Sequence, residues 1–418
     1  MWRLTSLLLG ITFSLPAQTP RESAPDWILP NFAQRLELEI SNPSDHPVDT
    51  LAIVPVEQAA RIAPHFPGTL AIVVIPGNPV LSVPSQADDL DGDGTPDEFV
   101  FTAKLAAGES RNVHIYYSTT LSDSIPWPKR VHASHAFGYN RATIALESEV
   151  IGYRTYGGFF LDIQARSEGH PGLNNSLVGY FGASHPVTIG RDIIHLGDTL
   201  GLGGLFLRSG DIVLRPPVNT PDYAHKPEVP DAPRYRVVST GPVRAMVEAR
   251  IDDWKIGSDE VDIRALYSIA AGAGSAECRF FLRPVHVTRT YDVGAGIRDL
   301  PQMKTDHAAG RLSLSGEQSR EIGRLGLGLY YDPAGADAGA PLLTKGESNQ
   351  IIVFHRKLQP GQGVTGRYWV AGAWSGSGIR DLPSYLAAEQ IRAQSAVKVA
   401  DYRFAKTPKP QRVEGEAF

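Results

Sequence analysis

The chain has 418 residues, and its 40 Lys and Arg residues nearly balance its 45 Asp and Glu residues, for a formal net charge of −5 at pH 7. Charges of both signs are interspersed without a basic block, which argues against nucleic acid as a partner. The single cysteine, Cys278, excludes an intramolecular disulfide, so stability must come from the large core that a chain of this length can bury.

The N-terminus has the pattern of a secretory signal peptide. Arg3 precedes an apolar run from Leu7 to Leu15, and a small residue, Ala17, follows it. The run is too short to cross a bilayer, and no later stretch reaches the ~18 apolar residues of a membrane helix. The pattern predicts that residues 1–17 are removed and that the protein is secreted or periplasmic, with no membrane contact afterwards.

Short alternating apolar runs recur along the chain, among them RLELEISNPS, EFVFTAKL, VRAMVEARI and VDIRALYSI. Clusters of Gly, Pro, Asn and Asp separate them, which is typical of strands in an all-β protein. The one convincing helix is DLPSYLAAEQIRAQSA near the end, where Pro383 stands close to the start of a run of helix formers. The sequence therefore predicts an all-β fold with one late helix.

A boundary is predicted at SDSIPWPKR, residues 122–130, where two prolines stand among polar residues. Residues 30–122 have the size of a small N-terminal β-sandwich. Residues 130–400 suit a large, galactose-mutarotase-like β-sandwich that would carry the chemistry. The tail at residues 406–418 is predicted to be disordered.

An acidic loop, DDLDGDGTPDE, occupies residues 88–98 of the first block and contains six acidic residues. Counted from Asp89, its oxygen-bearing residues follow the spacing of a calcium loop, with Gly94 at the sharp turn and Val100 where a bidentate Glu would stand. A solvated Asp-Gly turn before the next strand explains the same residues without an ion. The ligands predicted for a structural calcium are Asp89, Asp91, Asp93, Thr95 and Asp97.

Polar residues with possible chemistry gather in two stretches of the second block. In ALESEVIGYRTYGGFFLDI, residues 145–163, alternation along one strand predicts that Glu147, Glu149 and Tyr153 share a face and that Arg154 lies on the other. These polar groups are also compatible with ordinary turns and half-buried strands. The second stretch, GASHPVTIGRDIIHLGD, adds His185, Arg191, Asp192, His195 and Asp198.

Four separated motifs resemble a bacterial exported family of unknown-function domains: ALESEVIGYRTYG, GRDIIHLGDTLGLGGLFL, YRVVSTGPVRAMVEARIDDW and YWVAGAWSGSG. Members of this family are encoded beside polysaccharide-degrading enzymes, and one is an oligosaccharide dehydratase that removes water from a terminal uronic acid during ulvan breakdown. The resemblance spans most of residues 85–392. Leu146 departs from the Trp of the family pattern, and His195 falls where the family more often has another residue, which weakens a catalytic role for it.

The resemblance implies elimination of water or an alcohol from a uronic-acid-containing oligosaccharide or polysaccharide. Such a reaction needs a group that neutralises the carboxylate, a base for the neighbouring proton and an acid for the leaving oxygen, and it needs no cofactor. The predicted catalytic residues are His185 as base, Tyr153 or Tyr235 as acid, Arg154 or Arg191 as carboxylate clamp, and Asp192. The predicted substrate contacts are Glu149, His195 and Trp374.

Three other classes of function compete with this one: a glycoside hydrolase, a carbohydrate-binding protein and a structural surface protein, for which the polar motifs are more than scaffolding needs. A glycoside hydrolase would use two carboxylates about 5–10 Å apart. A non-catalytic carbohydrate-binding protein would need aromatic platforms only. The candidate carboxylates are Glu147, Glu149, Asp162 and Asp192, and the candidate platforms are Trp254, Trp369 and Trp374.

Overall fold

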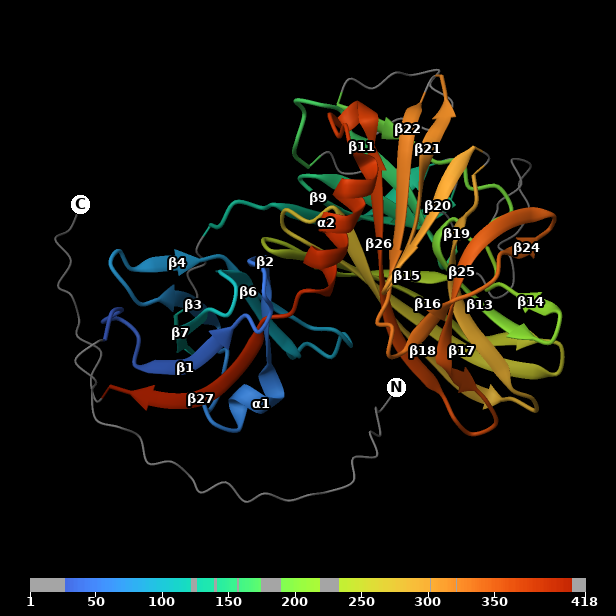
Figure 1. Ribbon diagram of the computed structural model, residues 1–418. Coiled ribbons are helices and arrows are strands. Elements are labelled where there is room, and N and C mark those ends of the chain that lie inside the picture. Colours follow the sequence, from blue (N-terminus) through green and yellow to red (C-terminus); the bar gives the residue numbers. More distant parts are fainter. Residues whose placement is uncertain are drawn as a thin grey trace.

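The computed structural model describes residues 27–121, 126–138, 141–155, 158–173, 189–218, 233–300, 302–320 and 322–407. Over this part of the chain the protein is almost entirely β, as the sequence predicts, and it forms two β-sandwich units that lie side by side (Figure 1). None of the helices in these residues is long and apolar enough to cross a membrane.

The first unit packs two small sheets against each other. Alternation along the strands turns Leu36, Leu38 and Ile40 toward Phe99 and Phe101 in one apolar core, which is the arrangement predicted from the alternating runs. The five-stranded sheet has the order β27 (Lys398–Lys406), β1 (Gln34–Ser41), β7 (Ser110–Ser118), β3 (Leu70–Ile75) and β4 (Leu81–Val83). The three-stranded sheet has the order β2 (Val48–Pro55), β6 (Glu98–Leu105) and β5 (Ser85–Asp88), and helix α1 (Val56–Ala60) follows β2.

The last strand of the chain belongs to this first unit. The expected division assigned residues up to 400 to the second unit, but β27 pairs antiparallel with β1, with Val399 opposite Ile40 (Figure 1, red beside blue). The apolar side chains of Val399 and Phe404 pack against the first core, which gives the segment its reason to return there. Residues 408–418 of the expected tail lie outside the described residues.

The second unit consists of two large sheets that enclose the main core. The 11-stranded sheet follows the path β23 (Ala336–Ala338), β25 (Glu347–Leu358), β19 (Tyr291–Arg298), β13 (Leu202–Ser209), β11 (Leu161–Arg166), β10 (Ile151–Thr155), β9 (Arg141–Ser148) and β8 (Val131–Gly138), with β12 (Gly190–Asp192), β14 (Ile212–Leu214) and β24 (Leu342–Thr344) beside it. The 8-stranded sheet has the order β15 (Arg234–Thr240), β16 (Arg244–Ile256), β17 (Asp259–Ala270), β18 (Ser275–His286), β26 (Val364–Trp374), β22 (Gly323–Tyr330), β21 (Arg311–Ser319) and β20 (Met303–Ala308).

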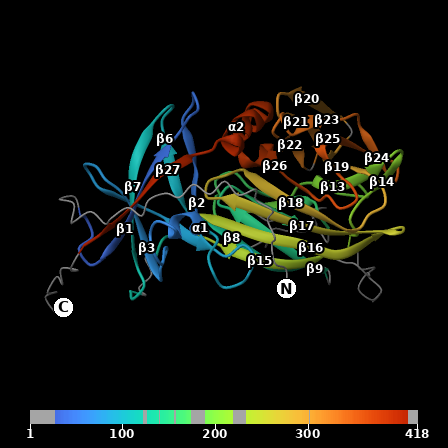
Figure 2. The same ribbon diagram turned by 90° about the horizontal axis from the view of Figure 1, so that it is seen from below.

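The predicted late helix is α2 (Leu382–Gln394), preceded by the 3₁₀ turn η1 (Ser375–Ser377). The Asp381 side chain caps its N-terminus by accepting a hydrogen bond from the Ser384 backbone N–H. Its apolar side packs Leu386 against Tyr330 on the outer face of the 8-stranded sheet. Figure 2 shows α2 on the side of the second unit that faces the first unit.

Buried ion pairs join the two units. Arg244 of β16 donates from Nε to Asp88 of β5 at 2.8 Å, and its Nη1 lies 2.7 Å from Glu98 of β6. Arg279 of β18 also donates to Glu98, at 3.1 Å. The Gln86 side chain accepts hydrogen bonds from the backbone N–H groups of Val243 and Arg244. Because Arg244 and Asp88 are each only 2% exposed, the two sandwiches meet through a desolvated polar contact.

Candidate functional site

A hairpin brings two predicted site residues onto one face. The sequence predicts one continuous strand through residues 145–155, but β9 ends at Ser148 and β10 begins at Ile151, with Glu147 opposite Gly152. The turn shifts the alternation by one position, so Glu147 shares its face with Arg154 rather than with Tyr153. The prediction of their relative faces was therefore wrong, because the alternation was counted through a turn.

The strand register places polar residues in two adjacent rows on the face of the 11-stranded sheet that points away from the main core. One row runs through Glu147, Gly152, Gln164 and Asp192. The next row contains Arg154 and Asp162, which are direct partners, and continues toward Arg298, whose backbone N–H donates to the Gly201 carbonyl at 2.7 Å. The opposite face of the same strands supplies Leu146, Tyr153 and Ile163 to the core.

Arg154 holds two buried carboxylates with a single nitrogen. Its Nη2 atom lies 2.8 Å from Asp162 Oδ2 and 3.0 Å from Asp192 Oδ2. The side chains of Arg154, Asp162 and Asp192 are 9%, 3% and 1% exposed. Burial raises the pKa of Asp192 well above its ordinary value, and the Asp162 carboxylate adds to the rise while Arg154 opposes it. Asp192 therefore holds its proton to a higher pH than an exposed aspartate does.

A second buried ion pair lies in the neighbouring row. Arg166 pairs with Glu147, and both side chains are almost fully buried, at 4% and 3% exposed. Gly152 lies beneath this pair, since a Cβ there would come within 3.5 Å of Arg166 Nη2. Each of the two arginines is thus already engaged by carboxylates of the protein, which leaves neither Arg154 nor Arg166 as an open clamp for a substrate carboxylate.

Gln164 lies between these two ion-paired groups. The side chain is 1% exposed, and its Nε2 donor has no hydrogen-bond partner among the described residues. A buried amide donor without a partner costs free energy, so its position beside Asp192 marks a place for a water or a ligand hydroxyl. Gln164 and Arg166 are not among the residues predicted from the sequence, although the alternation of polar residues in DIQAR places Asp162, Gln164 and Arg166 on one face.

The two predicted tyrosines face the main core from opposite sheets, Tyr153 from β10 of the 11-stranded sheet and Tyr235 from β15 of the 8-stranded sheet. The Tyr153 hydroxyl donates to the Gly274 carbonyl at 2.6 Å and accepts from the Gly372 N–H at 2.9 Å. Tyr235 packs against the main core, and its hydroxyl donates to the Gly158 carbonyl at 3.3 Å. Burial raises the pKa of both hydroxyls. Neither tyrosine shares the face that carries Asp192.

Three further predicted residues, the catalytic candidates His185 and Arg191 and the substrate contact His195, are placed as follows. His185 lies outside the described residues. Arg191 is opposite Ala165 in the register, so its side chain alternates away from the face of Asp192. His195 is exposed, and its Nδ1 lies 3.2 Å from Arg298 Nη1 at the far end of the second row.

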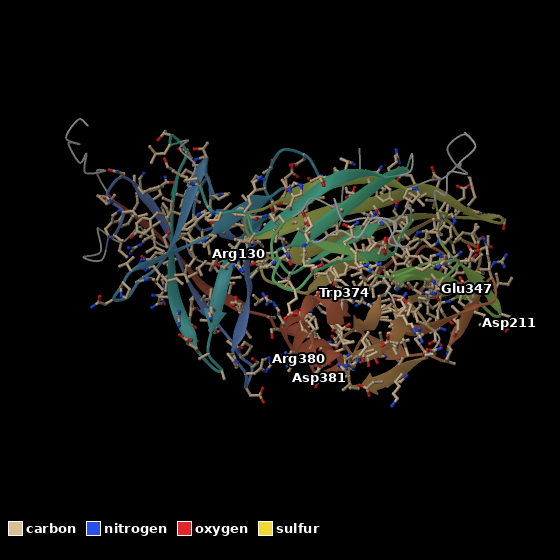
Figure 3. The ribbon with its side chains drawn as sticks, turned by 90° about the horizontal axis from the view of Figure 1, so that it is seen from above. Arg130, Asp211, Glu347, Trp374, Arg380 and Asp381 are labelled. Carbon is tan, nitrogen blue, oxygen red and sulfur yellow. The ribbon has the colours of Figure 1, made fainter. Side chains whose placement is uncertain are left out.

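Arg298 forms an ion pair at that end of the row, with its Nη2 atom 3.3 Å from Glu347 Oε1. Glu347 also accepts a hydrogen bond from the Asp198 backbone N–H at 2.6 Å. The Arg298 side chain is 14% exposed, so it remains accessible to solvent on the row that contains Arg154 and Asp162. Figure 3 shows Glu347 toward the end of the second unit that lies away from the first unit.

Two of the three predicted substrate contacts line one cavity of about 400 Å³. Trp374 and Glu149 both face it, together with Arg166, Glu168 and Tyr385. Figure 3 shows Trp374 near the middle of the molecule and Arg130, the ion-pair partner of Glu149, toward the first unit. Arg166 connects this cavity with the polar rows, because its guanidinium pairs with Glu147. His195, in contrast, does not line the cavity.

The acidic loop gathers three of the five predicted calcium ligands. Carboxylate oxygens of Asp89, Asp91 and Asp97 lie within 4.8 Å of one another. The Asp93 carboxylate instead accepts a hydrogen bond from the Thr95 backbone N–H at 2.7 Å. Burial raises the pKa of Asp97, and its two acidic neighbours add to the effect.

The loop also contacts the second unit. The Leu90 carbonyl accepts hydrogen bonds from the guanidinium groups of Arg236 and Arg264, each at 2.6 Å. The loop therefore serves to dock the first unit on the 8-stranded sheet, whether or not it holds an ion.

A family model described as a domain of unknown function, DUF4861, matches residues 40–399. No curated protein matches the chain in sequence.

Among solved structures, a protein of glycosyl hydrolase family 38 from Enterococcus faecalis is similar with a TM-score of 0.48 and 10% identity, over 88% of this chain and 47% of its own. An α-mannosidase from Enterococcus faecalis V583 has a TM-score of 0.48 and 8% identity, over 88% of this chain and 46% of its own. A putative kojibiose phosphorylase from the human microbiome has a TM-score of 0.34 and 10% identity, over 64% and 37%. This chain spans about half the length, or less, of these structures.

Proposed function

This chain belongs to the DUF4861 domain family, and we propose that it processes carbohydrate by eliminating water or an alcohol from a uronic-acid-containing oligosaccharide. The proposal places the reaction on the outward face of the 11-stranded sheet. The observation that carries it is the buried cluster in which Arg154 holds Asp162 and Asp192 with one nitrogen, beside the unpartnered Gln164 amide. The leaving oxygen requires a proton donor, and the raised pKa of Asp192 suits a carboxyl group to that role.

In the proposed reaction, a base removes the proton next to the sugar carboxylate, its electrons form the new carbon–carbon double bond, and the leaving oxygen departs with a proton from Asp192. Gln164 donates a hydrogen bond to a sugar hydroxyl, and Arg154 is a positioning residue because two carboxylates already engage it. Arg298 is the cation assigned to the sugar carboxylate. It lies in the same row and is partly exposed, and its partner Glu347 is 36% exposed, so the sugar carboxylate can replace Glu347 there. His185 remains the base predicted from sequence.

Hydrolysis by paired carboxylates is less well supported. Asp162 and Asp192 each lie within 3.0 Å of one nitrogen of Arg154, so no sugar ring fits between the two carboxylates. A purely carbohydrate-binding role is also weakly supported, because no aromatic platform is open at the predicted positions. Trp254, Trp369 and Trp374 are 5%, 9% and 8% exposed.

The test is incubation of the protein with a panel of uronic-acid oligosaccharides, followed by ultraviolet absorbance and mass spectrometry. Elimination creates a conjugated unsaturated uronate, so a new absorbance together with loss of one water, or with release of the saccharide linked through the leaving oxygen, is the expected result. Shorter saccharides without new absorbance would show hydrolysis and overturn the proposal. Binding without any product over a long incubation would indicate a carbohydrate-binding protein without activity and would also overturn the proposal.

We further propose that the acidic loop binds calcium, because three clustered carboxylates repel one another until a cation neutralises them. The expected result is a higher melting temperature on adding CaCl₂ than on adding NaCl of equal ionic strength. Asp91→Asn should abolish the difference, whereas Asp49→Asn, an exposed aspartate on β2, should preserve it. An equal melting temperature in CaCl₂ and in chelator would reject the site.

Export is proposed on the sequence pattern of residues 1–17, which lie outside the described residues. Expression of the full chain in a bacterial host, with N-terminal sequencing of the protein from the periplasm or medium, tests it. Cleavage after about position 17 is the expected result on the rule for signal peptides, and an intact N-terminus in the cytoplasm would contradict it.

A further inference from the structure

A cavity of about 190 Å³ lies where the two units meet, on the opposite side of the second unit from the polar rows. One wall is β2 of the first unit, which contributes Thr50. A second wall is the outer face of the 8-stranded sheet, with Ser268, Arg367 and Trp369. The third is the end of α2 and the segment that leads to β27, with Arg392. A ligand here would contact both sandwiches and the connection between them.

The lining of this cavity is strongly cationic. Arg244, Arg279, Arg367 and Arg392 all face it, against a single acidic lining residue, Glu277. Arg244 and Arg279 are neutralised by carboxylates, since Arg244 pairs with Asp88 and Glu98, and Arg279 pairs with Glu98 and Glu277.

Arg367 and Arg392 differ from these two. Neither forms an ion pair with any residue in the described part of the chain. The Arg392 guanidinium donates to the Ala271 carbonyl at 3.1 Å, and its acidic neighbour Glu389 is buried, which raises the pKa of that carboxyl. Two cationic groups without an ion-pair partner among the described residues thus face one small cavity, and the one carboxyl that interacts electrostatically with Arg392 is the buried Glu389, whose pKa Arg392 lowers against the effect of burial.

The Arg367 guanidinium lies over the Trp369 ring, 5.1 Å from the ring centroid, and this cation–π contact holds it in place without neutralising its charge. The hydroxyl groups of Ser268 and Ser275 lie in the same lining but already hydrogen-bond Glu277 and Glu389, so the two arginines are the groups left to bind an anion. We propose that this cavity is a binding site for a small oxyanion, a carboxylate or sulfate group of a small molecule, with Arg367 and Arg392 as its cationic ligands.

Occupancy of the site couples the two units. A bound anion would contact residues of β2, of the 8-stranded sheet and of the α2–β27 connection at once, so it stabilises their docked arrangement by mass action. The site is independent of the proposed reaction, because it lies on the other sheet and shares no residue with the Asp162–Asp192 pair.

The test is isothermal calorimetry on the full chain with glucuronate, with sodium sulfate and with glucose as the neutral probe, at constant ionic strength. Binding of glucuronate, of sulfate or of both supports the site and identifies the oxyanion it accepts, while glucose should not bind. Absence of binding by both anions at millimolar concentration overturns the proposal. Saturating anion should also raise the melting temperature of the whole chain.

Variants separate this site from other surface charges. Arg367→Gln and Arg392→Gln should each weaken binding by about tenfold or more, the loss expected for one charge-assisted hydrogen bond. Arg392→Lys should retain part of the affinity. The matched control is Arg356→Gln, since Arg356 is exposed on β25 and away from the cavity. Asp192→Asn should bind the anion as the unmodified protein does. Affinity unchanged in both Gln variants overturns the assignment.

Discussion

Asp162 and Asp192 share one nitrogen atom of Arg154 as their hydrogen-bond donor, at 2.8 and 3.0 Å. Two carboxylates and one guanidinium carry a net negative charge, and the three side chains are almost fully buried. A bound proton removes that charge at little cost, which is why the pKa of Asp192 lies well above its ordinary value.

Replacing Asp192 by Asn should abolish proton donation while preserving the fold. The amide of Asn can donate to Asp162 in place of the carboxyl proton, so the buried hydrogen bond survives. Turnover on a responsive uronate oligosaccharide should fall by about 10²- to 10⁴-fold, the usual contribution of a general acid. The control is Asp211→Asn at an exposed aspartate (labelled in Figure 3). Full activity in Asp192→Asn would remove Asp192 from the mechanism.

Replacing Arg154 by Met should destabilise the whole second unit. The substitution leaves two buried carboxylates without their cation, a change that costs about 3–5 kcal/mol of unfolding free energy. Urea unfolding followed by tryptophan fluorescence measures it. Arg356→Met removes an exposed arginine from β25 and should stay within about 0.5 kcal/mol of the unmodified protein. Equal midpoints for the two variants would mean that the triad contributes nothing to stability.

The Asp192 proton should also appear in the pH dependence of stability. Since the folded-state pKa of Asp192 is raised above the unfolded value of about 3.9, its contribution is fully present below that value and is lost as pH rises through the folded pKa. The unfolding free energy of the unmodified protein should therefore decline relative to Asp192→Asn as pH rises above about 4. A constant difference across that range would show that the carboxyl titrates normally.

At the contact between the units, Asp88→Asn should weaken docking. Arg244 would keep Glu98 but lose the carboxylate that receives its Nε–H, and breaking a buried pair costs about 3–5 kcal/mol. Calorimetry should show a lower melting temperature, with the first unit melting ahead of the second. Asp49→Asn, at an exposed position on β2, is the control. A single transition at the original temperature would contradict this account of the interface.

The sequence predicted well those elements of the fold that depend on residues close together in the chain. Alternation placed Leu36, Leu38 and Ile40 on one face, and the run of helix formers after Asp381 located α2. It did not predict that β27 joins β1, because nothing local in a strand identifies a partner more than 350 residues away.

The candidate site was predicted only in part. Arg154 and Asp192 were named, but as separate candidates, since their contact depends on the register of three strands. The turn at Glu149 changed which residues share a face of the sheet. The Tyr153 side chain lies in the main core instead of in the polar rows. The alternation in DIQAR was by itself enough to predict that Gln164 and Arg166 share a face with Asp162.

The pairing of β27 with β1 makes the large sandwich an insertion within the small one. During synthesis on a ribosome, β1 is translated first. It can pair with β27 only after the other described strands have been translated. The small sandwich is thus begun first and completed last. A nonsense codon just before Lys398 would consequently damage the small N-terminal sandwich. Without β27, β1 would be an exposed edge strand that can pair with strands of other molecules.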